Sequence, residues 1–103
     1  MIKNIYGVKM KEIYIDVYNQ YFYLHFGKDS YIKAYKEEPK YKGEVRSNKE
    51  GNIFMWVCDK KDTLTLIHES FHLGEIISKK VGIKFKGEVG AYLLECIVKQ
   101  VLK

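Results

Sequence analysis

The pattern of apolar residues changes near Asp59, and this change limits the folds open to the chain. Before Asp59 the apolar residues are mostly β-branched or aromatic and form short runs separated by turn residues, which is typical of strands. After Asp59 they recur every three or four residues, which is typical of helices. We therefore predict an α+β fold, with an N-terminal antiparallel β-sheet in residues 1–58 and two helices in residues 59–103.

The first half predicts a hairpin followed by a third extended segment. The β-branched and aromatic run from Glu12 to Phe26 is interrupted at Asn19-Gln20, so we expect two strands joined by a turn. We assign Tyr31 to Lys36 as a further strand, because Pro39 prevents a helix from continuing past it.

The segment before Asp59 combines a polar stretch with an apolar one. Residues 40–52 are polar and contain two glycines, which predicts a long loop or an irregular hairpin. Ile53 to Cys58 is almost continuously apolar, which is the pattern of a strand covered on both faces.

Two helices are expected in the second half. Asp59 and Asp62 both suit the N-cap of a helix from Thr63 to about Lys80, and Gly82 supplies a left-handed stop. A last helix is predicted from Glu88 to about Leu102.

Length and charge restrict the function classes. With 103 residues, 47% of them hydrophobic, the chain predicts one folded domain spanning residues 1–103 and not a disordered segment. Lys and Arg exceed Asp and Glu by 18 to 13, but the basic residues are spread along the chain. We therefore do not expect a nucleic-acid partner, and a basic nucleic-acid-binding module is the weakest alternative.

The cysteines and the N-terminus indicate a cytoplasmic protein. Cys58 and Cys96 lack the dense spacing of a disulfide framework, so we expect buried free thiols. No apolar stretch is long enough to cross a bilayer, and the N-terminal residues lack the apolar run of a signal peptide.

The motif H-E-x-x-H falls on the first predicted helix. His68 and His72 are four residues apart, so their imidazoles project from one face and can bind one Zn²⁺ ion. Glu69 lies about 100° round the helix from His68, which lets its carboxylate act as general base on a metal-bound water. The other interpretation is that these are ordinary polar side chains of a helix.

A catalytic zinc site needs a third protein ligand besides the two histidines. His25 lies in a predicted strand, where we expect a half-buried or surface role, so an acidic residue after the motif is the better candidate. Glu75 lies on the same helix face as His68 and His72, and Glu95 would lie level with the motif in a tight helical hairpin.

The segment from Thr63 to His72, with Gly82-Ile83 and residues 88–93, resembles small zincin-like proteins encoded by bacteriophages and prophages. The resemblance covers about the last two fifths of the chain, and Glu88-x-x-Ala91-Tyr92 is also similar to the third-ligand helix of repressor-cleaving metalloproteases of mobile elements. It implies a minimal zincin-like fold of the gluzincin type, in which Glu88 completes the metal site. The six residues before Glu88 can span on the order of 20 Å, enough to carry it back to His72.

The resemblance also implies a place for the substrate. In zincins an edge strand binds extended peptide by adding a β-strand, and Ile53 to Cys58 occupies that position here, with Met55 or Trp56 lining the cleft. Tyr92, one turn beyond Glu88, is a candidate donor to a transition-state oxyanion, although it also suits a purely structural role.

These residues support two principal functions. The first is a zinc-dependent metallopeptidase that hydrolyses a peptide or protein substrate, with His68, His72 and Glu88 as ligands and Glu69 as catalytic base. The alternative is a phage-derived binding or inhibitor protein in which a structural or vestigial zinc site serves contact with a host-cell protein, in the cytoplasm of the bacterial host.

Overall fold

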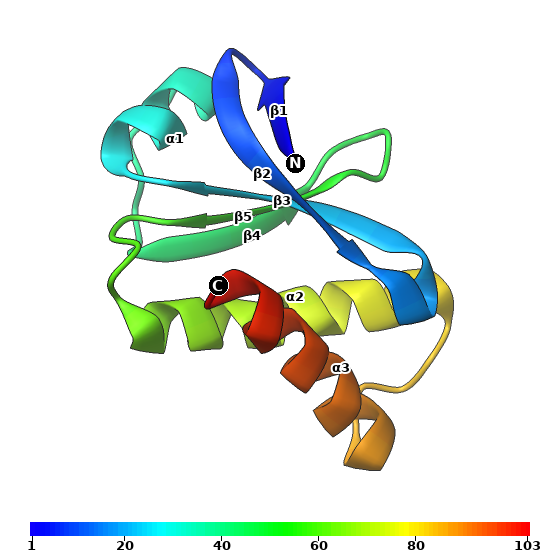
Figure 1. The fold of residues 1–103 in the computed structure, drawn as a ribbon. Helices are drawn as coiled ribbons and strands as arrows, with labels where there is room; N and C mark the ends of the chain where they lie inside the picture. Colours follow the sequence, from blue (N-terminus) through cyan, green and yellow to red (C-terminus); the bar gives the residue numbers. More distant parts are fainter.

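The five strands form one mixed sheet in the order β1-β2-β3-β5-β4 in the computed structural model, which describes residues 1–103 (Figure 1). The strands are β1 (Ile2–Ile5), β2 (Val8–Ile15), β3 (Gln20–Phe26), β4 (Gly43–Ser47) and β5 (Ile53–Val57). The predicted α+β class and the β2–β3 hairpin are confirmed. The prediction of a wholly antiparallel sheet is wrong, because β3 and β5 pair in parallel. Their connection includes a helix and the antiparallel strand β4, so the chain re-enters the sheet in the direction in which it left.

A helix, α1 (Lys28–Tyr35), occupies the segment where we predicted a strand from Tyr31 to Lys36. The helix ends at Lys36, whose backbone N–H donates to the carbonyl of Ile32, so it stops before Pro39 interferes. Tyr31 and Tyr35 are one helical turn apart, and their rings pack edge to face. The strand prediction failed because the aromatic residues are spaced for one face of a helix as well as for a strand.

The β4–β5 hairpin resolves the segment that the sequence left open as a loop or irregular hairpin. Gly43 to Ser47 pairs antiparallel with β5, and all five residues of β5 are buried. Successive side chains of a strand point to opposite faces, so the burial of all five confirms the prediction of a strand covered on both faces.

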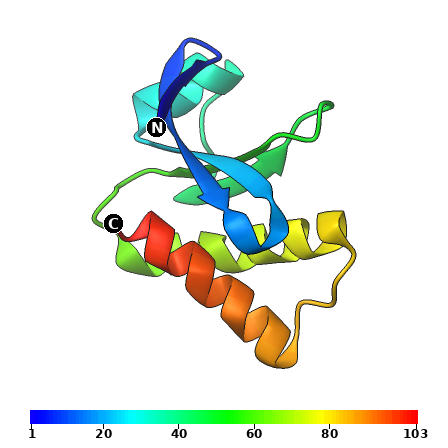
Figure 2. The same cartoon turned by 45° about the vertical axis from the view of Figure 1, so that its right-hand side comes forward.

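The helices α2 (Thr63–Val81) and α3 (Gly87–Val101) lie together on one face of the sheet, and α1 lies on the other (Figures 1 and 2). Asp62 is the N-cap of α2, and its side chain accepts a hydrogen bond of 3.1 Å from the backbone N–H of Thr65. Gly82 ends α2 with a φ of 79°, in the left-handed conformation that glycine adopts without strain. Both predicted helices are therefore confirmed, with ends within two residues of those expected.

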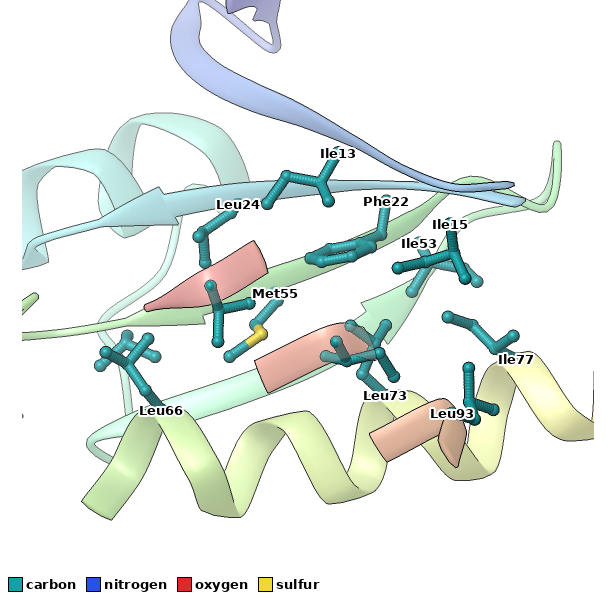
Figure 3. Close-up of a cluster of buried hydrophobic side chains, with 13 residues drawn as sticks. Ile13, Ile15, Phe22, Leu24, Ile53, Met55, Leu66, Leu73, Ile77 and Leu93 are labelled. Atoms are coloured by element: carbon teal, nitrogen blue, oxygen red, sulfur yellow. The ribbon is translucent and has the colours of Figure 1, made fainter. Parts of the chain in front are cut away.

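The main core lies between the sheet and the α2–α3 pair (Figure 3). It contains thirteen buried residues: Ile13, Ile15, Phe22, Leu24, Ile53, Met55, Val57, Leu66, Leu73, Ile77, Leu93, Ile97 and Val101. Leu66, Leu73 and Ile77 of α2 lie along one stripe of the helix, and burial of this stripe fixes which other residues of α2 face away from the core.

The opposite face of the sheet holds an aromatic and polar network beneath α1. His25 is buried there and not half-buried or on the surface as predicted; its Nδ1 hydrogen-bonds with the Ser30 hydroxyl and its Nε2 lies 3.0 Å from the Tyr35 hydroxyl. The guanidinium of Arg46 lies 3.7 Å from the centre of the Tyr35 ring. Burial, and then the charge of Arg46, lower the pKa of His25 to about 4.

Both cysteines are free thiols, but neither is buried. Cys58 is exposed just after β5 ends, and Cys96 is partly buried on α3, so the predicted burial is wrong. None of the three helices has both the length and the apolar character needed to cross a bilayer.

We expect the protein to lose stability as the pH falls from 6.5 to about 4. An unfolded His25 takes up a proton near pH 6.5, whereas the folded protein holds it neutral down to about pH 4, so protonation favours unfolding between these values. The loss attributable to His25 is on the order of 3 kcal/mol. Urea unfolding at several pH values measures it, with His25→Gln as the control. If the free energy of unfolding falls as steeply in His25→Gln as in the wild type, the assignment is wrong.

Candidate metal and catalytic site

The two histidines of the motif converge on the exposed side of α2. His68 and His72 lie one turn apart, and their Nε2 atoms are 3.2 Å from each other. Two nitrogens bound to a tetrahedral zinc ion at about 2.05 Å would lie about 3.3 Å apart. The two imidazole nitrogens are therefore spaced to fill two coordination positions of one zinc ion. The same distance also suits an N–H···N hydrogen bond between the rings.

Glu75 holds the ring of His72 from its other side. The Oε1 atom of Glu75 lies 3.1 Å from Nδ1 of His72, so an Nδ1–H can donate to this carboxylate. That tautomer leaves the lone pair of Nε2 directed toward His68. In this arrangement Glu75, which the sequence left open as a third ligand, contacts the nitrogen of His72 that faces away from His68.

Glu69 is turned about the helix axis toward the sheet. Its side chain is buried, and burial raises the pKa of the carboxyl group, whereas the charges of His68 and His72 act to lower it. A buried carboxylate with a raised pKa is a better proton acceptor than an exposed one. Glu69 is thus placed as a base and lies beside the histidine pair.

Gly43 of β4 makes room for Glu69, and sequence analysis did not identify it as a site residue. A Cβ atom at position 43 would lie 2.7 Å from Cγ of Glu69 and 2.8 Å from the methyl group of Thr65. Only glycine therefore permits this approach of β4 to α2. The sequence carried no pattern that distinguishes Gly43 from the turn glycines around it.

A cavity of about 460 Å³ lies between β4 and α2 and includes the motif. Its lining residues are Tyr41, Lys42, Gly43, Glu44, Val45, Thr65, His68, Glu69 and His72. Tyr41 and Lys42 also line the cavity, and neither was predicted as a site residue. The tertiary structure thus combines the motif with a strand whose sequence gave no functional indication.

β4 presents a free backbone edge to this cavity. Hydrogen bonds join Cys58 N to Lys42 O at 2.8 Å and Asn48 N to Asn52 O at 3.0 Å, one at each end of the β4–β5 ladder. Since bonded positions alternate in an antiparallel ladder, the backbone groups of Gly43, Val45 and Ser47 point away from β5.

The edge strand beside the motif is therefore β4, and the prediction that Ile53 to Cys58 forms it is wrong. β5 is paired on both sides, so it has no free edge to offer a peptide. Met55 and Trp56 are fully buried and cannot line a cleft.

The structure does not bring a third donor to the histidine pair. No group of three or more His, Cys, Asp or Glu side chains is arranged to hold a metal ion. Glu88 and Glu95 are exposed on α3 and do not line the cavity. Tyr92, also exposed on α3, lies outside the cavity too. The assignments of Glu88 as ligand and Tyr92 as oxyanion donor stay predictions.

Comparisons with models of protein families, with curated proteins and with solved structures found no match for this chain.

We expect Gly43→Ala to lower the free energy of unfolding by about 1–3 kcal/mol, because the new methyl group overlaps Glu69 and Thr65. Chemical denaturation measures the loss. The matched control is the same substitution in a Thr65→Ser, Glu69→Ala background, which removes both facing groups and should reduce the cost to under about 0.5 kcal/mol. Equal costs in the two backgrounds would show that the close approach is not the cause.

Proposed function

We propose that this protein is a zinc-dependent metallopeptidase-like protein of the small zincin type, acting on a peptide or protein in the bacterial cytoplasm. One observation supports it most: the Nε2 atoms of His68 and His72 converge to 3.2 Å beside the buried carboxylate of Glu69, in a cavity below a free strand edge. Two convergent imidazoles, a buried carboxylate and a free strand edge are among the parts that hydrolysis of an extended peptide requires.

The imidazoles of His68 and His72 would hold the zinc ion, and Glu75 would keep His72 in the tautomer that binds metal. When bound, zinc supplies a Lewis acid that polarises a carbonyl group and lowers the pKa of water. A third protein donor is needed for a catalytic site. We propose Glu88 for it, which requires the first turn of α3 to approach His72.

Glu69 would take the proton from the attacking water and pass it to the leaving amine. Its burial favours proton uptake, and its position next to the histidines keeps it within the same cavity. The backbone edge at Gly43 and Val45 would orient the substrate by hydrogen bonds, which bind any sequence and leave selection to side chains.

The first test is metal content. We expect about one equivalent of zinc per chain, and His68→Ala or His72→Ala should abolish binding because each removes one of two convergent donors. Zinc titration with elemental analysis measures this.

Glu75→Ala should weaken zinc binding by about 10- to 100-fold without abolishing it, as expected for an orienting group. Glu88→Ala tests the third donor. Wild-type protein that takes up no zinc would refute the proposal.

The second test separates the base from the ligands. Glu69→Gln keeps the shape of the side chain and both imidazoles but removes the proton acceptor, so zinc content should persist while peptide hydrolysis falls at least about 100-fold. Mass spectrometry of a peptide mixture measures hydrolysis, and added chelator controls for contaminating enzymes. Zinc binding with no hydrolysis in the wild type would instead assign the phage-derived binding or inhibitor protein.

A further inference from the structure

The stripe of α2 that faces β4 continues beyond the histidines. It includes residues three or four apart along the helix, namely Thr65, Glu69, His72, Ile76 and Lys80. A second hollow of about 450 Å³ lies at its far end, lined by Ser47, Gly51, Ile53, Ile76, Lys79 and Lys80. Both hollows lie between α2 and the β4–β5 hairpin. They follow one another along this stripe, and we call the two together the β4–α2 groove.

The two lysines of the second hollow differ in their contacts. Nζ of Lys80 donates a 2.8 Å hydrogen bond to the carbonyl of Gly51, which ties the end of α2 to the β4–β5 turn. Lys79 is exposed, and it takes part in none of the ion pairs of the protein. No acidic side chain lines this hollow. Lys79 thus presents a positive charge beside Ile76, and the nearest acidic residue on this side of α2 is Glu75, one turn earlier, whose carboxylate contacts His72.

The distance between the two hollows sets the position of a complementary charge on a bound peptide. Lys79 is seven residues beyond His72, a rise of about 10 Å along the helix, which corresponds to about three residues of extended peptide. β4 and α2 run in the same direction along the groove, because Gly43 lies beside Glu69 and Ser47 lines the hollow with Lys79. A peptide added antiparallel to β4, the slightly more stable pairing, would place its N-terminal part beside Lys79.

We propose that the β4–α2 groove selects extended peptides that carry an acidic side chain about three residues N-terminal to the position beside His72, where Lys79 pairs with it. This inference rests on the proposed function, which assigns the groove as the peptide site. To that function the inference adds Lys79 as a residue that determines specificity, and a bound peptide that runs antiparallel to β4. The backbone edge of β4 supplies affinity for any extended chain, and the charge of Lys79 adds the preference for an acidic side chain near the N-terminus of the peptide.

The test uses zinc-loaded Glu69→Gln protein, which should bind peptide without cleaving it. The probes are fluorescein-labelled ten-residue peptides of identical composition, with a single Asp near the N-terminus in one and near the C-terminus in the other. We expect the N-terminal isomer to bind about twofold to fivefold more tightly by fluorescence anisotropy at low salt. Adding Lys79→Glu should remove this preference and create one for the matching peptide with Lys in place of Asp.

Lys3→Glu is the matched control, because it makes the same charge change on β1, at the opposite edge of the sheet from β4. It should leave the preference between isomers intact. Equal binding of the two isomers, or the same loss in Lys3→Glu as in Lys79→Glu, would overturn the inference.

A second arm separates this inference from the proposed function. Replacing both His68 and His72 by Ala removes the expected metal site but leaves the second hollow, so the preference that depends on Lys79 should persist. If the protein binds no zinc but keeps this preference, the proposed metallopeptidase function is wrong, whereas the selection of acidic peptides by the β4–α2 groove is supported. If zinc binds but the preference is absent, only the selection by Lys79 fails.

Discussion

The contact between Gly43 of β4 and the side chains of Glu69 and Thr65 on α2 is the constraint on which the site depends. It brings the free edge of the sheet directly against the helix that carries the histidines. Any side chain larger than glycine's hydrogen would push the strand or Glu69 away. The same contact buries the carboxylate and so raises its pKa, which means that one packing requirement sets both the shape of the cavity and the basicity of Glu69.

The other face of β4 is held by a different set of interactions. Glu44 and Arg46 point away from α2 and toward α1, where Glu44 accepts a 2.9 Å hydrogen bond from the hydroxyl of Tyr31 and Arg46 stacks on Tyr35. An edge strand has neighbours on one side only, so these contacts supply restraint that sheet pairing alone lacks. The buried, neutral His25 completes the network through Tyr35. α1 therefore supports the site from the far side of the sheet without contributing a residue to it.

Within α2, two helical stripes have separate roles. The stripe with Leu66, Leu73 and Ile77 packs against the sheet and fixes the rotation of the helix about its axis. Once that rotation is fixed, His68 and His72 must lie at the solvent side of the β4–α2 groove and Glu69 at its floor. The convergence of the imidazoles follows from their spacing of four residues on one helix, whereas core packing decides which side of α2 they occupy. Glu75 then refines the orientation of one ring.

Local pattern in the sequence was sufficient for the α+β class, the limits of α2 and α3, the restriction of the cap to Asp59 or Asp62, and the pairing of His68 with His72, because all of these depend on residues within a few positions of one another. Tertiary structure alone decided that β3 and β5 are parallel, that β4 is the edge strand beside the motif, that His25 is buried and that Glu75 orients His72 from outside the histidine pair. These features depend on which distant segments meet. Strand order and the space beside Gly43 are set by the packing of the whole core. The periodicity of apolar residues within one segment does not indicate how distant segments pack together.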